Sequence, residues 1–248
     1  MSENDWRDAS AYAYVSELSL AGLAWEFLRR NAAYRAAFDA GPDTAAVTRD
    51  WGLSAPANPA GSAEGQAVLW RPDVSPRTLA LVASSADLND VLVFEPQSWP
   101  GVTRQHTCAD GVHILVRIRA EEHRLWSAQA PYIGQPLVIA LPLDAHLAVR
   151  TEAAARLMDS LMGRKPKAVK RFSRGFLRRL VLALRALDGR AAGASQREIA
   201  EGVLNARYGS PRVWEDSAAR AMTARLLRFG AAMASGGYRS LLASRKST

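Results

Sequence analysis

The pattern of apolar positions first indicates helices. Over residues 5–40, apolar side chains supply a stripe of the kind found on one side of a helix. They are Leu18, Leu23, Trp25, Phe27, Leu28, Tyr34 and Phe38, and the polar side carries Arg29, Arg30 and Arg35. Gly41-Pro42 ends the pattern, and residues 52–66 have the Ala, Pro, Gly and Ser content of a linker. We therefore expect an N-terminal helical segment within residues 1–50.

Short apolar runs then follow, and they predict strands. The runs are residues 68–70, 79–82, 91–94, 113–119 and 137–141, and they are bounded by Pro, Asp or Gly. Partial alternation within the fourth run is typical of a strand with one buried face. The order of helices, strands and helices predicts an α+β fold, with a mostly antiparallel central sheet over residues 66–143.

Helical periodicity returns at Asp144 and predicts an all-α domain over residues 144–248. Residues 172–187 are amphipathic. Ser195 and Glu198 have the spacing of a capping box, which starts a short second helix. Ser210-Pro211 then starts a long third helix that we expect to continue to Ala234. This order of helices indicates a helix-turn-helix, although the connection over residues 205–209 is longer than usual.

Charge is divided unevenly along the chain. Residues 1–150 carry 12 Lys/Arg against 17 Asp/Glu, whereas residues 151–248 carry 20 Lys/Arg against 7 Asp/Glu. Such asymmetry is typical of a polyanion-binding module joined to a non-binding one. The cations expected to contact the DNA backbone are Lys167, Lys170, Arg171, Arg174, Arg178, Arg179 and Arg197. Arg185 falls on the same outward side of the first helix.

The third helix offers candidates for base contacts. We expect its buried stripe to contain Trp214, Ala218, Met222, Leu226, Phe229 and Met233. Its outward residues would then enter the major groove, and the base-contacting candidates are Arg212, Ser217, Arg220 and Thr223. The alternative interpretation is an ordinary three-helix bundle with a solvated basic face.

The sequence offers little support for catalysis. The four histidines (His106, His113, His123 and His146) lack metal-ligand spacing, and the single cysteine, Cys108, cannot form an internal disulfide. We therefore expect no enzyme activity, no cofactor and no metal. No apolar run approaches the roughly 20 residues that span a bilayer, and the N-terminus lacks a secretion signal. These features predict a cytoplasmic protein without membrane contact.

Several motifs resemble those of a known family. Asp5-Trp6-Arg7 and residues 25–34 are similar to the first segment of two-part proteobacterial transcriptional regulators. Residues 182–188, 193–200 and 236–242 are similar to their second domain, which contains a helix-turn-helix. The family includes excision activators of integrative and conjugative elements and regulators of type VI secretion. The resemblance covers roughly half the chain and is poor through the strand-rich middle.

The resemblance implies sequence-specific binding to double-stranded DNA and activation of mobile-element or secretion-system genes. It also implies a homo-oligomer and contacts with RNA polymerase or a small antiactivator. The alternative is that the protein is itself an antiactivator, which binds another regulator rather than DNA. In either case, we expect the N-terminal apolar stripe to pack against the central sheet or across a subunit interface.

Overall fold

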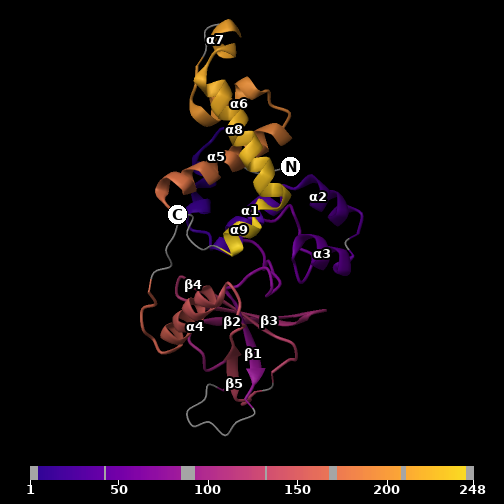
Figure 1. Ribbon diagram of the computed structural model, residues 1–248, viewed down its shortest axis with the longest axis vertical. Coiled ribbons are helices and arrows are strands. Elements are labelled where there is room, and N and C mark those ends of the chain that lie inside the picture. The colour runs from indigo at the N-terminus through magenta and orange to yellow at the C-terminus, as the bar shows by residue number, and fades with distance from the viewer. Residues whose placement is uncertain are drawn as a thin grey trace. The chain divides into compact units, whose positions relative to one another are not determined.

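The computed structural model describes residues 5–41, 43–84, 93–131, 133–167, 172–207 and 211–243, without the side chains of Thr44, Pro211 and Arg212. Its contacts form two units (Figure 1). The first contains residues 1–42, 57–68 and 170–241, and the second contains residues 43–56, 69–169 and 242–248. Segments far apart in the sequence therefore fold together, and each unit is described by itself.

The first unit begins with three short helices. They are the 3₁₀ helix η1 (Ser10–Ser16), α1 (Leu20–Leu28) and α2 (Ala32–Asp39). The side chain of Ser19 accepts a hydrogen bond from the Gly22 amide, and that of Asn31 accepts one from the Tyr34 amide. These caps divide the helical segment expected over residues 5–40, because each starts a new helix.

The aromatic residues of these helices are buried within the first unit. Trp25 and Tyr34 are fully buried and pack edge to face, with ring centroids 5.7 Å apart. The Trp25 indole donates to the Gly61 carbonyl at 3.0 Å, and the Tyr34 hydroxyl donates to the Ala57 carbonyl at 2.6 Å. Residues 57–66 of the expected linker are thus part of the first unit. The expected packing of the apolar stripe, on the central sheet or across a subunit interface, is wrong for these two residues.

Helices from the C-terminal third complete the first unit. They are α5 (Arg174–Ala191), α6 (Gln196–Leu204), α7 (Pro211–Glu215), α8 (Ala218–Ala232), the π-helical turn η2 (Met233–Gly237) and α9 (Arg239–Leu242). In Figure 1, α8 crosses α5 and α7 lies beyond the start of α8. Ala186 of α5, Ile199 and Val203 of α6, and Leu226 of α8 share one apolar core.

The second unit contains a five-stranded sheet with the order β2-β3-β4-β1-β5. The strands are β1 (Thr78–Ala83), β2 (Val102–Cys108), β3 (Gly111–Ile118), β4 (Glu121–Ser127) and β5 (Leu137–Ala140). Only the β1–β4 pairing is parallel, and the β1–β5, β2–β3 and β3–β4 pairings are antiparallel. The expected α+β fold with a mostly antiparallel sheet is confirmed.

One face of this sheet packs on α4 (Leu147–Leu161). Ile114, Val116 and Leu125 of the sheet share a core with Leu157 of α4. A further helix, α3 (Thr44–Trp51), precedes the first strand. Within the described parts of the chain, no helix is long and apolar enough to cross a membrane.

The strand predictions were only partly correct. β2 and β4 were not expected, because most β2 side chains are exposed and β4 contains charged residues in place of an apolar run. Residues 68–70 were expected to form a strand, but only Trp70 pairs there, in an isolated bridge with Leu53. Residues 91 and 92 lie outside the described residues, and Val93 makes an isolated bridge with Pro136.

Candidate nucleic-acid interface

Helix α8 lies closely against α5 and α6. A Cβ atom added at Gly230 of α8 would be only 2.9 Å from the Leu187 side chain of α5, so the absence of a side chain permits this approach. The Gln196 side chain, at the start of α6, donates to the Arg220 carbonyl of α8 at 2.8 Å. The second contact links the start of α8 to the start of α6.

The N-terminal residues are built into this helical packing. Trp6 is 5% exposed and belongs to the core shared by α5, α6 and α8. A Cβ atom added at Gly202 of α6 would be 2.6 Å from the Trp6 ring, and one at Gly189 of α5 would be 3.1 Å away. The two glycines therefore leave the space that the indole occupies.

Arg185 of α5 holds this N-terminal segment in place. Its guanidinium donates to the carbonyls of Trp6 and Arg7, at 2.9 and 2.6 Å, and to that of Gly202 at 2.8 Å. The expectation that Arg185 faces outward is wrong, because the side chain is buried. Helical periodicity could not reveal that a segment almost 180 residues away covers this side of α5.

Buried ion pairs and hydrogen bonds also join the N-terminal segment to α5. Asp188 of α5 accepts hydrogen bonds from the Arg30 guanidinium at 2.7 and 2.8 Å and from the Tyr12 hydroxyl at 2.5 Å. Arg30 also bonds Glu26, which accepts a further bond from Arg29. Burial raises the pKa of Glu26, but the charges of Arg30 and Arg29 outweigh burial and hold this pKa below its usual value. The N-terminal arginines thus stabilise the helical unit, although they were expected on a polar face.

The expected backbone-contacting residues differ in their surroundings. Arg174 and Arg178 are exposed on α5, and neither has an ion-pair partner in the described part of the chain. The Arg179 guanidinium lies 4.0 Å from the centroid of the Phe229 ring, which orients it beside α8. Arg197 of α6 forms an ion pair with Glu201 at 3.0 Å.

The structure does not place the other three backbone-contacting candidates beside these arginines. Lys167 is exposed but belongs to the second unit, so its position relative to the helices is not described. Lys170 and Arg171 lie outside the described residues.

The expected third helix is interrupted, which changes the surroundings of the base-contacting candidates. The Ser217 hydroxyl accepts from the Arg220 amide at 3.1 Å and donates to the Trp214 carbonyl at 2.8 Å, so Ser217 is the cap of α8. Arg220 is exposed, and its guanidinium donates to the Glu215 carbonyl at 3.0 Å. Arg212 lies in α7, but its side chain is not among those that the structure describes.

The sequence assigned some residues to the wrong side of α8. Thr223, expected outside, is fully buried and donates to the Ala219 carbonyl at 2.8 Å. Met222, expected inside, is 46% exposed. Leu226 and Met233 are buried as expected, and Phe229 packs near Phe176 of α5, with ring centroids 6.4 Å apart.

The exposed side of α8 is basic. Arg220, Arg225 and Arg228 are exposed, and their spacing places all three within one half of the helix circumference. The buried residues Thr223, Leu226 and Gly230 occupy the other half. Arg225 was not among the sequence-predicted candidates, although its spacing from Arg228 was a signal that could have identified it.

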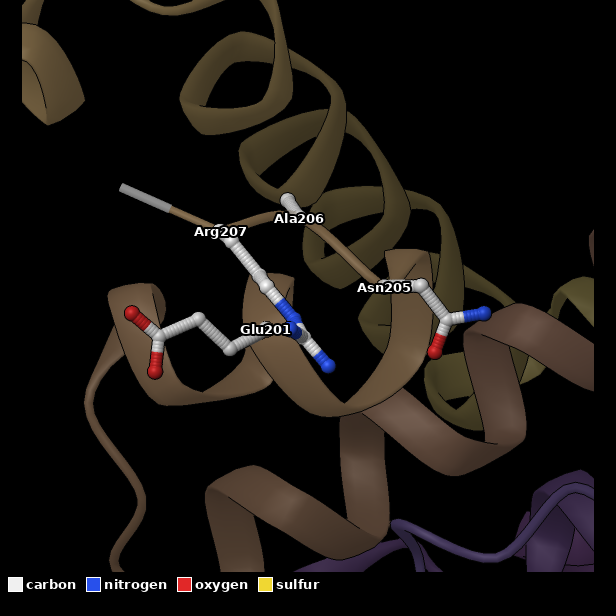
Figure 2. A pocket seen from close by; sticks show the side chains of 4 residues that line it. All are labelled: Glu201, Asn205, Ala206 and Arg207. Atoms are coloured by element: carbon white, nitrogen blue, oxygen red, sulfur yellow. The ribbon is translucent and has the colours of Figure 1, made fainter. Parts of the chain in front are cut away.

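An open hollow lies at the end of α6. Figure 2 shows its lining residues, Glu201, Asn205, Ala206 and Arg207, and the Arg207 side chain extends back along the last turn of the helix. Asn205 ends α6 with a positive φ of 54°. The lining offers a guanidinium and an amide to an anion, but these four residues contain no pairing of a nucleophile with a base.

Comparisons with known proteins matched two parts of the chain. Residues 140–243 match a DNA-binding domain of transcription factors for the type VI secretion system (T6SS). Residues 5–56 match a proteobacterial transcriptional regulator-like domain. A search of curated proteins found no match. The family matches confirm the expected resemblance and support a DNA-binding regulator.

Proposed function

Because the chain combines the two parts of a proteobacterial transcriptional regulator, we propose that it binds double-stranded DNA through α8. The observation that carries the proposal is the division of α8 into a buried side and an exposed side with Arg220, Arg225 and Arg228. A helix about 10–12 Å wide fits a major groove about 12 Å wide. The N-terminal half of α8 would enter this groove.

In this proposal, α6 and α8 are the two helices of a helix-turn-helix whose connection is lengthened by α7. The bond from Gln196 to the Arg220 carbonyl supports a fixed angle between them. A fixed angle matters because the first helix must lie across the DNA backbone while the second enters the groove.

Two sets of side chains would make different contacts. Arg174, Arg178, Arg179 and Arg197 would bind phosphates, together with Lys167, Lys170 and Arg171 from the preceding basic segment. Arg220 and Arg212 would contact bases, for which guanine O6 and N7 are the usual acceptors of arginine. We leave out Ser217 and Thr223, because their hydroxyls bond the backbone near the start of α8 and Thr223 is buried.

We further propose that the protein is a cytoplasmic activator without enzyme activity, acting on mobile-element or secretion-system genes. It would act as a homo-oligomer, because a symmetric assembly presents two reading helices to one face of the duplex. RNA polymerase or a small antiactivator would be its protein partner. The alternative function is an antiactivator that binds another regulator, and the exposed arginines of α8 favour the DNA-binding function.

Gel-shift titration with the duplex upstream of the protein's own gene tests this proposal. Arg220→Ala should weaken specific binding by about 1–3 kcal/mol and leave binding to unrelated duplexes nearly unchanged. Arg190→Ala, an exposed arginine in the last turn of α5, is the control and should leave both affinities unchanged. An absence of duplex binding, with a regulator bound stoichiometrically, would favour the antiactivator.

A further inference from the structure

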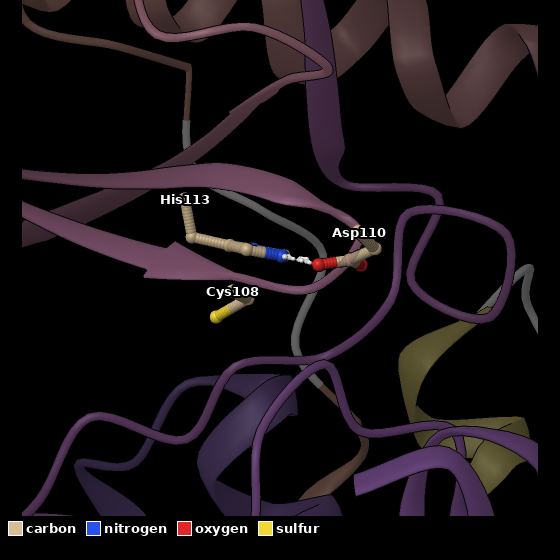
Figure 3. Close-up of side chains that lie close together, drawn as sticks. All are labelled: Cys108, Asp110 and His113. Atoms are coloured by element: carbon tan, nitrogen blue, oxygen red, sulfur yellow. Dashed lines mark hydrogen bonds and ion pairs between the residues drawn. The ribbon is translucent and has the colours of Figure 1, made fainter.

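The β2–β3 hairpin brings together three side chains of metal-binding types. Cys108 ends β2, Asp110 lies in the turn and His113 lies on β3 (Figure 3). One ligand atom from each residue lies within 4.8 Å of the others. The His113 Nε2 atom is 3.3 and 3.4 Å from the two Asp110 carboxylate oxygens.

The turn that carries these residues is held in place. Gly111 has a φ of 132°, and a Cβ atom there would be 2.4 Å from the Ser127 carbonyl oxygen of β4. The Asp110 carboxylate also accepts a hydrogen bond from the Ser54 hydroxyl at 2.6 Å, and the Asp110 carbonyl accepts one from the Trp126 indole at 3.1 Å. A ligand oriented by such outer hydrogen bonds is typical of metal sites.

The separations suit a small tetrahedral ion. Zinc binds thiolate, imidazole and carboxylate ligands, with nitrogen and oxygen at about 2.0–2.1 Å. Two such ligands at the tetrahedral angle are about 3.3 Å apart, which is the separation between His113 Nε2 and Asp110 Oδ1. The Cys108 sulfur, at about 2.3 Å from zinc, would lie about 3.5 Å from each of them and needs a movement on the order of 1 Å.

His106 provides a candidate for the fourth ligand. It pairs with His113 across the two strands, and Cys108 is two residues further along β2, so the three side chains lie on one face of the sheet. The His106 Nε2 atom is buried and has no hydrogen-bond partner among the described residues. Because an unpaired buried nitrogen is unfavourable, a bound ion would satisfy it.

We propose that this hairpin binds a divalent metal ion, zinc by its ligand chemistry, through Cys108, Asp110 and His113, with His106 as the fourth ligand. On binding, the Cys108 thiol releases its proton to solvent, and neutral His113 carries its proton on Nδ1, because Nε2 then binds the ion. The site lies on the face of the sheet opposite the side chains that pack on α4, because His113 alternates with the core residues Val112 and Ile114. The proposal does not depend on DNA binding.

Cobalt titration of the reduced, chelator-treated full chain tests the site. Cobalt bound by a thiolate gives a charge-transfer absorption band, and Cys108 is the only cysteine in the chain. We expect the band to saturate at one ion per chain and to disappear when zinc is added. Cys108→Ser should abolish it, and His113→Gln and Asp110→Asn should each weaken cobalt binding at least about 10-fold. His146→Gln is the control and should change nothing.

Circular dichroism of each metal-free variant separates loss of a ligand from loss of folding. If His113→Gln does not fold, Asp110→Asn decides, because it keeps the side-chain shape. Zinc should also raise the melting temperature of the wild-type chain but not of Cys108→Ser, since a ligand that binds only the folded state stabilises it. The absence of a charge-transfer band, or equal cobalt affinity in the wild-type chain and folded Asp110→Asn, would overturn the proposal.

Discussion

The two halves of α5 carry arginines in opposite surroundings. Arg178 and Arg185 are two helical turns apart and therefore point to the same side of the helix. Arg178 is exposed and has no ion-pair partner in the described part of the chain, whereas Arg185 is buried and donates to three backbone carbonyls. The difference arises from Trp6 and Arg7, which cover only the second half. A basic stripe on a helix therefore combines side chains available to a ligand with side chains that hold the fold.

The largest expected effect is the loss of the buried carboxylate of Asp188, in the same half of α5 as Arg185. Asp188→Ala should lower the free energy of unfolding by about 3–5 kcal/mol, because Arg30 would be left buried without this carboxylate. Urea denaturation of the full chain measures the change. A loss below about 1 kcal/mol would mean that the ion pair does not join the N-terminal segment to α5.

A pair of variants compares the two halves of α5 directly. Arg185→Met should destabilise the protein by about 1–3 kcal/mol, because the carbonyls of Trp6, Arg7 and Gly202 lose their donor. Arg178→Met removes the same charge from an exposed position and should change stability by no more than about 0.5 kcal/mol. Thermal unfolding of both variants is the measurement. Equal losses would contradict the distinction between the two arginines.

A pair of glycine variants tests how tightly Trp6 is enclosed. Gly202→Ala should destabilise the protein by about 1–2 kcal/mol, because its Cβ atom would be 2.6 Å from the Trp6 ring. Gly175→Ala, in the first turn of α5 with no atom within 4 Å of the added Cβ, should instead stabilise it by up to about 1 kcal/mol. Stabilisation by both changes, measured in urea, would indicate that Trp6 is not held between α5 and α6.

The smallest expected effect concerns pH. The pKa of Glu26 is lowered in the folded protein, so its contribution to stability is present above the pKa of an unfolded glutamate, about 4.3, and is lost as the pH falls through the folded value. Glu26→Gln should therefore be less stable than the wild-type chain at neutral pH. The gap between their unfolding free energies should narrow below about pH 4, and a constant gap would contradict the lowered pKa.

Local signals in the sequence predicted much of the helical region. The capping box of Ser195 and Glu198 is present, and α6 starts where it indicated. The interruption before α8 was missed, because Ser217 was assigned to an outward face and not to a cap. The expected domain ranges stay predictions, and the sequence offered no sign that Arg30 and Asp188, 158 residues apart, form an ion pair.

The strand-rich region was harder to predict for a different reason. The exposed strand β2 lacks an apolar run, so its pairing with β3 left no periodic signal. Without that pairing, no pattern connects Cys108, Asp110, His113 and His106, and the sequence alone predicts no metal site. The turn brings them together only once the hairpin register is known.

The salt dependence of DNA binding tests the central claim most directly. Each phosphate contact releases counterions, so affinity falls with salt by a slope of about 0.9 per contact. The double variant Arg174→Ala, Arg178→Ala should reduce the slope of log K against log salt by about two units for any duplex, while the protein remains folded. An unchanged slope would mean that the exposed half of α5 is only a solvated face and would contradict the proposed interface.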